Sequence, residues 1–358
     1  MPAEPRKGMP DPSLTREVFD HRFRERFVDP AFDKLKVEID RLAEVAWDAY
    51  SDGRKAPYTQ EAGAGYADPA YKLSDDWRAA KQAIDEAQRQ HDNRQLPLRV
   101  LLINGSSRSE HTCPGEMSKT WRMLEMARAV LSHTEDVEIE VLDLSRLTSE
   151  YGRHIHPCKA CFSTAAPLCH WPCSCFPNHG QGQVQDWMNE IYPMWVRAHG
   201  VMIITPVNWY QAPSPLKQMI DRMVCADGGN PDPTSTGGKD AARAKEMELN
   251  GWSYPRHLEG RLFSLIVHGD TEGAETLRRM LSDWMTSLHM APAASAAVFE
   301  RYIGYFKPYA TSHDDLDADT DLQEEVRIAA RALLEALRCK RDGNVLPLES
   351  LQLERRPK

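Results

Sequence analysis

The sequence has no excess of positive charge, no long apolar run and no apolar segment at its start. Its 44 Lys and Arg residues are outnumbered by 53 Asp and Glu, which gives a formal net charge of −9. General nucleic-acid binding needs a basic face, so we expect no nucleic-acid partner. No apolar run approaches the roughly 20 residues of a membrane span, so we expect no membrane partner. The opening residues, MPAEPRKGMPDPS, do not form a secretory signal, and we expect a cytoplasmic protein.

Two common phosphate-binding patterns are also absent, although a loop of the right kind is present. The apolar run 100–103 suits a strand that is buried on both faces, and the polar residues NGSSRS follow it. A segment with helical spacing then begins at Ser118. The loop has neither the dinucleotide glycine fingerprint nor the Walker lysine. A serine-rich loop with Arg108 before a helix start suits one phosphate, held on backbone N–H groups. The alternative is an ordinary polar loop between strand and helix.

Apolar runs alternate with amphipathic segments over the following residues. Strands are predicted at 100–103, 137–142, 201–204, 262–267 and 296–299, and helices at 119–132, 184–196, 216–224, 274–288 and 322–337. This alternation indicates an α/β fold, a doubly wound sheet of five parallel strands with right-handed crossovers. A polar insertion at 227–260 contains a short helical piece at 241–249.

The two ends of the chain differ from this pattern. Residues 1–97 are predicted to form an N-terminal helical extension, with helices at 32–50 and after Ser74. This extension has no evident catalytic residues, so we expect a helical pair that covers the core or a partner subunit. Residues 98–340 form the predicted α/β domain, and 341–358 a polar tail.

Three loops follow the predicted strands, at 105–120, 206–214 and 268–273. Ligands of such sheets bind outside the carboxyl ends of the strands, so these loops should converge. The second loop places Asn208, Trp209 and Tyr210 between prolines, which suits a planar ring. The third offers His268, Gly269 and Asp270. Together the loops indicate a mononucleotide such as FMN. The alternative for Trp209 and Tyr210 is a packed surface loop.

The chain resembles the NADPH-dependent FMN reductase family of flavodoxin-like proteins. The segments that carry the resemblance are VLLINGSSRS, MSKTWRMLEMA and MIITPVNWYQAPSPLKQMIDRM, within residues 99–299. The resemblance implies a flavodoxin-like fold with FMN as cofactor and NAD(P)H as co-substrate. It also implies a homodimer or a tetramer built from dimers.

The resemblance also implies roles for individual residues. It assigns the FMN phosphate to Ser106, Arg108, Ser118, Lys119 and Thr120, and the isoalloxazine ring to Pro206, Val207, Asn208, Trp209 and Tyr210. The chain departs from the family pattern by an insertion at 110–117 in the phosphate loop. The N-terminal extension and the insertion at 227–260 are further departures.

A loop rich in cysteine lies between the second and third predicted strands. Cys158, Cys161, Cys169, Cys173 and Cys175 have the spacing C-x2-C-x7-C-x3-C-x-C. Iron–sulfur flavoproteins, a distantly similar branch, carry a cluster at this place, but their spacing differs. We expect no metal here and keep an iron–sulfur cluster, zinc or a redox dithiol as alternatives. His156, His170 and His179 are equally well explained as solvated loop residues or as ligands.

The sequence therefore predicts an FMN-dependent NAD(P)H oxidoreductase. Electrons would pass from NAD(P)H through FMN to a quinone, flavin or similar small-molecule acceptor. The flavin carries this chemistry, so we assign no catalytic side chain. The first alternative is an iron–sulfur flavoprotein that carries electrons without direct NAD(P)H turnover. The second is a flavodoxin-like binding module whose site has lost its activity.

Overall fold

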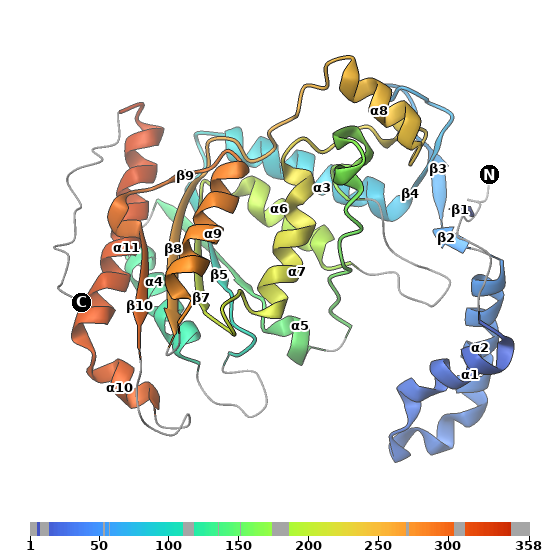
Figure 1. The fold of residues 1–358 in the computed structure, drawn as a ribbon, viewed down its shortest axis with the longest axis horizontal. Helices are drawn as coiled ribbons and strands as arrows, with labels where there is room; N and C mark the ends of the chain where they lie inside the picture. Colours follow the sequence, from blue (N-terminus) through green and yellow to red (C-terminus); the bar gives the residue numbers. More distant parts are fainter. Residues whose placement is uncertain are drawn as a thin grey trace.

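The structure is a computed structural model of the chain. It describes residues 6–7, 14–52, 54–56, 58–109, 118–134, 136–150, 152–173, 186–269, 272–303 and 312–344. Figure 1 shows a sheet with helices on both of its faces, and a pair of helices near the N-terminus that lies apart from it. No helix in the described ranges has both the length and the apolar character needed to cross a membrane.

The central sheet is parallel and has the strand order of a flavodoxin-like fold. Its main strands are β5 (Leu98–Asn104), β6 (Val137–Asp143), β7 (Gly200–Pro206), β8 (Leu262–Gly269) and β10 (Val298–Tyr302). They lie in the order β10–β8–β7–β5–β6 and all pair in parallel. In chain order this is 2-1-3-4-5, the doubly wound arrangement with its switch point between β5 and β7. The predicted five-stranded fold class is therefore confirmed.

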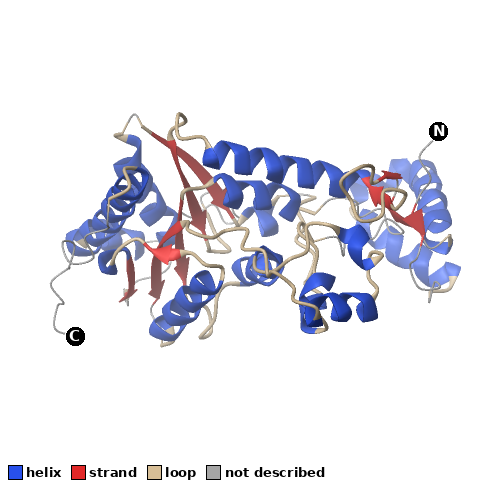
Figure 2. Cartoon of the chain, turned by 90° about the horizontal axis from the view of Figure 1, so that it is seen from above, coloured by secondary structure: helices blue, strands red, loops and turns tan. Residues whose placement is uncertain are grey.

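Helices cover both faces of this sheet, as Figure 2 shows from above. The covering helices are α3 (Asp75–Asp92), α4 (Lys119–Ser132), α6 (Met188–Arg197), α7 (Ser214–Arg222), α9 (Ala274–Ser287) and α11 (Thr320–Arg341). Leu101 and Ile103 of β5 belong to the cluster with α3, α6, α7 and α9. Val100 and Leu102 point to the opposite face and belong to the cluster with α4 and α11. This alternation explains why the run 100–103 is apolar throughout.

The remaining elements are short or lie outside the sheet. They are β1 (Arg6–Lys7) paired with β2 (Arg54–Ala56), β3 (Thr59–Glu61) paired with β4 (Lys72–Ser74), and β9 (Ala291–Pro292) paired with β8. The other helices are α1 (Arg16–Arg24), α2 (Lys36–Ser51), α5 (Arg146–Ser149), α8 (Ala241–Leu249) and α10 (Ser312–Ala318).

Element boundaries differ from the predictions at several ends. The last strand begins at Val298, because residues 295–297 form a 3-10 turn whose Ala297 carbonyl accepts a hydrogen bond from Ser264. Helix α6 begins at Met188, after Asp186 accepts a hydrogen bond from its backbone N–H. Helix α11 continues to Arg341 because Arg338 and Arg341 both pair with Asp136.

The N-terminal extension consists of two parts with different surroundings. Helices α1 and α2 pack on each other through aromatic rings, with the ring of Phe19 5.2 Å from that of Tyr50. We call residues 14–52 the arm. Helix α3, by contrast, belongs to the body, because Ile84 and Ala87 join the core cluster of the sheet. The β3–β4 hairpin and helix α1 were missed by the sequence analysis.

Candidate functional site

The loop after β5 is held by the side chain that ends this strand. Asn104 accepts a hydrogen bond from the Ser106 N–H at 3.1 Å and donates one to the Arg108 carbonyl at 3.1 Å. The Ser106 hydroxyl in turn accepts one from the Arg108 N–H at 3.0 Å. A Cβ added at Gly105 would lie 2.7 Å from Thr205 Cβ, so only glycine lets the loop approach β7 this closely.

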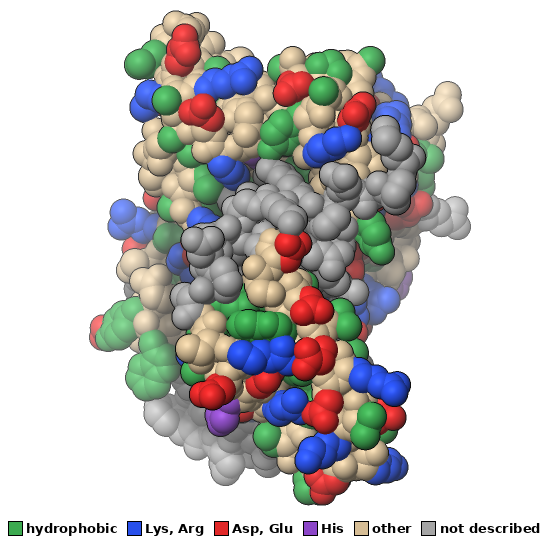
Figure 3. Space-filling model, turned by 90° about the vertical axis from the view of Figure 1, so that its right-hand side faces the viewer, with side chains coloured by type: hydrophobic (Ala, Val, Ile, Leu, Met, Phe, Trp, Pro, Cys, Tyr) green, Lys and Arg blue, Asp and Glu red, His purple; other side chains and the backbone are tan. Residues whose placement is uncertain are grey.

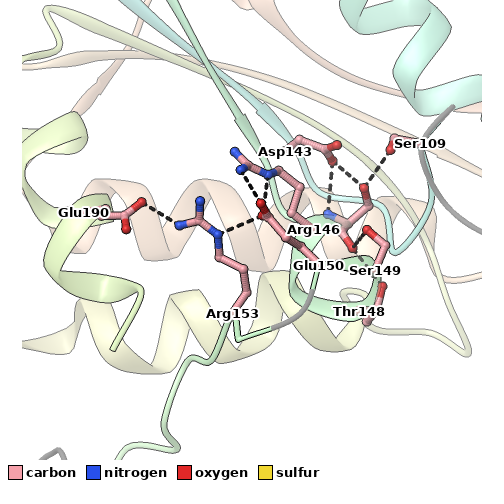
Figure 4. A network of polar contacts seen from close by, with 9 residues as sticks. Ser109, Asp143, Arg146, Thr148, Ser149, Glu150, Arg153 and Glu190 are labelled. Atoms are coloured by element: carbon pink, nitrogen blue, oxygen red, sulfur yellow. Dashed lines mark hydrogen bonds and ion pairs between the residues drawn. The ribbon is translucent and has the colours of Figure 1, made fainter. Parts of the chain in front are cut away.

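A second set of polar contacts ties this loop to the end of the neighbouring strand β6 (Figure 4). Asn104 donates to Asp143 at 2.7 Å, and the Ser145 hydroxyl lies 2.7 Å from Asp143 and 2.9 Å from the Ser109 hydroxyl. Buried hydrogen-bond networks of this kind rigidify the segments that they join. The loop after β5 is therefore held by β7 on one side and by the end of β6 on the other, without the help of a ligand.

Beyond this network, Figure 4 shows a chain of surface ion pairs that runs from Arg146 on α5 through Glu150 and Arg153 of the following loop to Glu190 on α6. Hydrogen bonds from Arg146 and Arg153 lower the pKa of Glu150 to about 2. Arg153 also pairs with Glu190 at 2.6 Å. These charges neutralise one another at the surface. We therefore infer that they stabilise the segment after β6 and do not bind a ligand.

Helix α4 begins at the opposite end of the loop with a regular N-cap. The Ser118 hydroxyl accepts a hydrogen bond from the Trp121 N–H at 2.9 Å. Lys119 and Thr120 occupy the first turn, where the remaining backbone N–H groups and the helix dipole favour an anion.

His268 at the end of β8 lies beside this helix start. Its Nε2 is 2.8 Å from the Thr120 hydroxyl, and both side chains are buried. Burial, and then the charge of Lys119, lower the pKa of His268 to about 3. The imidazole is therefore neutral at physiological pH and fixes the Thr120 hydroxyl by sharing a hydrogen bond with it.

The loop after β7 forms a tight hairpin. The backbones of Asn208 and Gln211 exchange two hydrogen bonds of 2.9 Å, which leaves Trp209 and Tyr210 as the two turn residues. Their φ angles are 48° and 65°, both left-handed. This matches a type I′ turn, in which Asn-Gly is usual and bulky residues are strained. Trp209 is 91% exposed and Tyr210 is 58% exposed, so the hairpin displays both rings on the surface.

The loop after β8 packs directly on this hairpin. A Cβ at Gly269 would lie 2.4 Å from Val207 Cγ1, so a larger residue would push the two strand ends apart. Gly273, with φ of 103°, lies against Tyr210 in the same way. Asp270, predicted as a site residue, lies outside the described residues.

The three loops enclose one cavity of about 250 Å³ at the carboxyl ends of β5, β7 and β8. We call it the strand-end cavity. Its described lining is Ser106, Ser107, Arg108, Ser118, Lys119, Thr120, Pro206, Val207, Asn208, His268, Gly269 and Ile303. Arg108 and Lys119 are the only charged members of this set, so the cavity is built for an anion.

Most of the predicted site residues meet in this cavity, but two do not line it. Trp209 and Tyr210 lie at the tip of the adjacent hairpin instead. The sequence analysis missed Ser107 and Ile303. Ser107 was implied by its neighbours in the serine loop, whereas Ile303 follows β10 and no local pattern marks it.

The cysteines lie elsewhere, in a loop that packs on the insertion. Cys158, Cys161 and Cys173 are half-buried and Cys169 is buried, while Cys175 and His179 lie outside the described residues. Within the described ranges, no group of three or more His, Cys, Asp or Glu side chains could hold a metal ion. His170 instead lies 3.1 Å from the Thr236 hydroxyl, and the His156 carbonyl accepts a hydrogen bond from Arg222.

Comparison with known families and structures gives the following matches. A family model described as NADPH-dependent FMN reductase matches residues 98–302, more than half of the chain. Among curated proteins, no match to the chain was found.

Several solved structures are similar to the chain. RosB with its bound intermediate 8-demethyl-8-formylriboflavin-5′-phosphate is 13% identical over 70% of this chain and 82% of its own, with a TM-score of 0.46. A flavone reductase is 15% identical over 72% and 66% of the two chains, with a TM-score of 0.38. An NAD(P)H:quinone oxidoreductase from Methanothermobacter marburgensis is 17% identical over 69% and 100%, with a TM-score of 0.36.

Proposed function

The chain belongs to the NADPH-dependent FMN reductase family, and from this we propose that it passes electrons from NAD(P)H through FMN to a quinone, flavin or similar small acceptor. Members of this family are NAD(P)H-dependent flavin enzymes, so the chain is an oxidoreductase. The identity of the acceptor and the assignment of the residues below are our proposals.

The observation that carries the proposal is the charge of the strand-end cavity. Its described lining contains two cations, Arg108 and Lys119, four hydroxyl-bearing side chains and no carboxylate. We assign the FMN phosphate to Ser106, Arg108, Ser118, Lys119 and Thr120. Charge-assisted hydrogen bonds to a phosphate are about twice as strong as neutral ones, so this donor set fits the group.

The remaining lining is suited to the flavin ring. We assign the ring to Pro206, Val207, Asn208 and Gly269, with Asp270 next in sequence. Trp209 and Tyr210 form a strained, exposed edge beside this wall, where they can cover a ring that extends out of the cavity. Backbone strain of about 1–3 kcal/mol per residue persists only where the surroundings enforce it, which is common at ligand sites.

When bound, FMN supplies the redox chemistry, which is hydride acceptance from NAD(P)H and electron donation to the acceptor. The residues of this chain bind the phosphate, orient the ring and exclude water from the wall formed by Val207 and Gly269. His268 is neutral, so its role is to hold the Thr120 hydroxyl toward the phosphate. No side chain is needed as an acid or base.

The alternative of an iron–sulfur electron carrier has less support. The four described cysteines of the loop, Cys158, Cys161, Cys169 and Cys173, form no metal-binding group with the other described residues. Our proposal rests on the family match and uses FMN alone. From the family resemblance we also propose a homodimer or a tetramer built from dimers.

A visible spectrum of the purified protein, recorded before and after anaerobic NADPH addition, tests the proposal. We expect flavin absorbance from about one FMN per chain, and bleaching by NADPH or NADH. Broad iron–sulfur absorbance, or flavin that no pyridine nucleotide reduces, would favour the electron carrier. Protein that binds no FMN when it is supplied would contradict the proposal.

A further inference from the structure

A second cavity, of about 540 Å³, lies on the cysteine-loop side of α7. We call it the cysteine-loop cavity. Its described lining is Cys158, Ala160, Phe162, Ser163, Ile220, Asp221, Val224, Asp227, Trp284, Ser287 and Leu288. It shares none of these residues with the strand-end cavity. Its volume lies within the range of cavities that bind drug-sized molecules, about 300–1,000 Å³.

Helix α7 separates the two cavities along its length. The helix begins at Ser214, directly after the Trp209–Tyr210 hairpin, whereas Ile220 and Asp221 near its end line the cysteine-loop cavity. At 1.5 Å per residue, Ile220 lies about 9 Å along the helix from Ser214. The cysteine-loop cavity is therefore a separate site and not an extension of the flavin site.

The walls of this cavity are mainly apolar and aromatic. Phe162, Ile220, Val224, Trp284 and Leu288 provide the apolar surface. The Trp284 ring is held in place by an edge contact with the buried Trp195 ring, with centroids 5.8 Å apart. Rigid aromatic walls favour a ligand with a flat apolar body, because aromatic rings stack at little entropic cost.

The charge that faces this cavity is negative. Asp221 and Asp227 are the only charged residues in its described lining. Asp221 pairs with Lys217 at 2.6 Å, and Asp227 lies 3.2 Å from His289 Nε2. Neither Lys217 nor His289 lines the cavity, so the described lining itself contributes two carboxylates and no cation. A ligand with a cationic group is therefore favoured over an anionic one.

Left-handed backbone occurs in the lining of this cavity and next to it. Among the described residues, five besides glycine have left-handed φ angles. Trp209 and Tyr210 lie beside the strand-end cavity. Of the other three, Ala160 lines the cysteine-loop cavity, His289 follows its lining residue Leu288, and Tyr254 packs on Gly228, with φ angles of 53°, 61° and 47°. Such strain collects at functional sites and needs the surrounding packing to enforce it.

The insertion at 227–260 provides this packing. Gly228, with φ of 76°, has the rings of Tyr254 and Phe162 against it, since a Cβ there would lie 2.9 Å and 3.4 Å from them. The indole of Trp252 donates a hydrogen bond to the Gly228 carbonyl at 2.9 Å. The insertion thus fixes Phe162 of the cysteine loop as a wall of the cavity.

We propose that the cysteine-loop cavity is a second small-molecule site, which takes a flat aromatic molecule with a protonated amine. The aromatic body lies between Phe162 and Trp284, and the ammonium group faces Asp227. The proposed site gives a role to the cysteine loop and to the insertion at 227–260. Neither segment takes part in the proposed flavin chemistry.

Calorimetric titration of the FMN-loaded protein with tryptamine and with indole-3-propionate tests the charge preference. The two probes share the indole and differ in the sign of their charge. We expect tryptamine to bind at least tenfold more tightly than indole-3-propionate. Equal affinities, or no binding of tryptamine at millimolar concentration, would overturn the proposal.

Two substitutions locate the binding. Asp227→Asn should weaken tryptamine at least tenfold while its amide keeps the contact with His289. The matched control Asp283→Asn, on the exposed side of α9, should leave the affinity unchanged. Ser287→Lys, at an exposed lining position, should also weaken tryptamine by placing a cation beside its site. Unchanged affinity in both lining variants would place tryptamine elsewhere and contradict the proposal.

A chemical readout that is independent of the calorimetry uses the cysteines. Tryptamine should slow the alkylation of Cys158 by iodoacetamide, followed by peptide mass spectrometry. Cys339 on α11, which does not line the cavity, serves as the internal reference and should react at an unchanged rate. Equal protection of both cysteines, or protection of neither, would argue against occupancy of this cavity.

Discussion

Single residues give the two cavities opposite charge. Arg108 and Lys119 make the strand-end cavity cationic, whereas Asp221 and Asp227 make the cysteine-loop cavity acidic. Both pairs come from segments that are polar in sequence. Only the fold brings each pair together in the lining of one cavity, where the two like charges add to a local field that favours a ligand of opposite charge.

Arg108→Ala should weaken FMN binding by roughly 10- to 150-fold. The substitution removes one charge-assisted phosphate contact, worth about 1.5–3 kcal/mol. Fluorescence titration of apoprotein with FMN measures the change. Arg128→Ala, which removes an exposed cation on the same α4 helix, is the matched control and should bind FMN normally. Unchanged affinity in Arg108→Ala would remove this residue from the site.

His257 should make the stability of the protein depend on pH. The ring stacks on Trp171 with centroids 4.6 Å apart, and burial lowers the pKa of His257 to about 4. In the unfolded chain the pKa is about 6.5, so the unfolded state binds the proton first. Stability is therefore fully present above about pH 6.5 and falls as the pH drops toward 4.

Urea unfolding at a series of pH values tests this contribution. Between pH 6.5 and 4, His257→Gln should reduce the slope of the unfolding free energy by up to about 1.4 kcal/mol per pH unit, which corresponds to one proton. Glutamine retains a donor for the Gly229 carbonyl that His257 contacts at 2.9 Å. His133→Gln, at an exposed position after α4, is the control. Identical slopes in wild type and His257→Gln would refute this assignment.

At the scale of elements, the hairpin at 208–211 combines strain with exposure. Its two turn residues are large aromatics in a conformation that favours glycine. An aromatic pair in such a turn contributes little to the core, since Trp209 is almost fully exposed. We therefore infer that the hairpin serves to present the two aromatic rings to a ligand and not to fill the core.

Trp209→Gly should reduce activity without reducing the stability of the fold. Glycine relieves the left-handed strain, so the unfolding free energy should stay constant or rise by up to about 1 kcal/mol. The flavin absorption spectrum should change and the NADPH oxidation rate should fall, because the covering ring is lost. Urea unfolding and steady-state assays measure the two effects.

Tyr254→Gly is the control for this experiment. It changes another left-handed aromatic position, which lies beside the cysteine-loop cavity, and it should leave the flavin spectrum unaltered. A loss of stability of several kcal/mol in Trp209→Gly would instead show that the indole is a packing residue.

At the scale of the whole molecule, the arm has exposed aliphatic side chains. Val28, Val37, Leu42 and Val45 are 78%, 60%, 54% and 66% exposed. Figures 1 and 2 both place the arm at the end of the molecule opposite to α11. On the side seen in Figure 3, basic and acidic side chains alternate over the arm. Helix α2 carries three of these residues, Val37, Leu42 and Val45, so it presents apolar side chains that a partner subunit could cover.

We expect a homodimer in which the arm contributes to the contact. A stable interface buries about 1,600 Å² or more, so the dimer should persist at sub-micromolar concentration in analytical ultracentrifugation. The double substitution Val37→Glu with Val45→Glu should shift the protein toward monomer, because it places charges in the contact. Leu249→Glu, at a 78% exposed position on α8, is the matched control. A dimer that survives the double substitution would place the interface on the body.

Local features of the sequence determined the elements of the body and the order in which they occur. Apolar periodicity predicted the parallel strands, and Ser118 before Lys119 predicted the start of α4 at the residue where it occurs. These signals are readable because caps and periodicity act within a few residues. The convergence of three loops followed from the general geometry of parallel sheets, without any contact being known.

Tertiary structure alone decided which side chains meet. Thr120 and His268 are 148 residues apart and share a hydrogen bond, and the insertion packs on the cysteine loop through Asn230, whose N–H donates to the Cys169 carbonyl. The same long-range packing makes α3 part of the core and leaves Trp209 exposed. No local pattern encodes these outcomes, because burial and side-chain partners depend on how distant segments cross and fill the space between them.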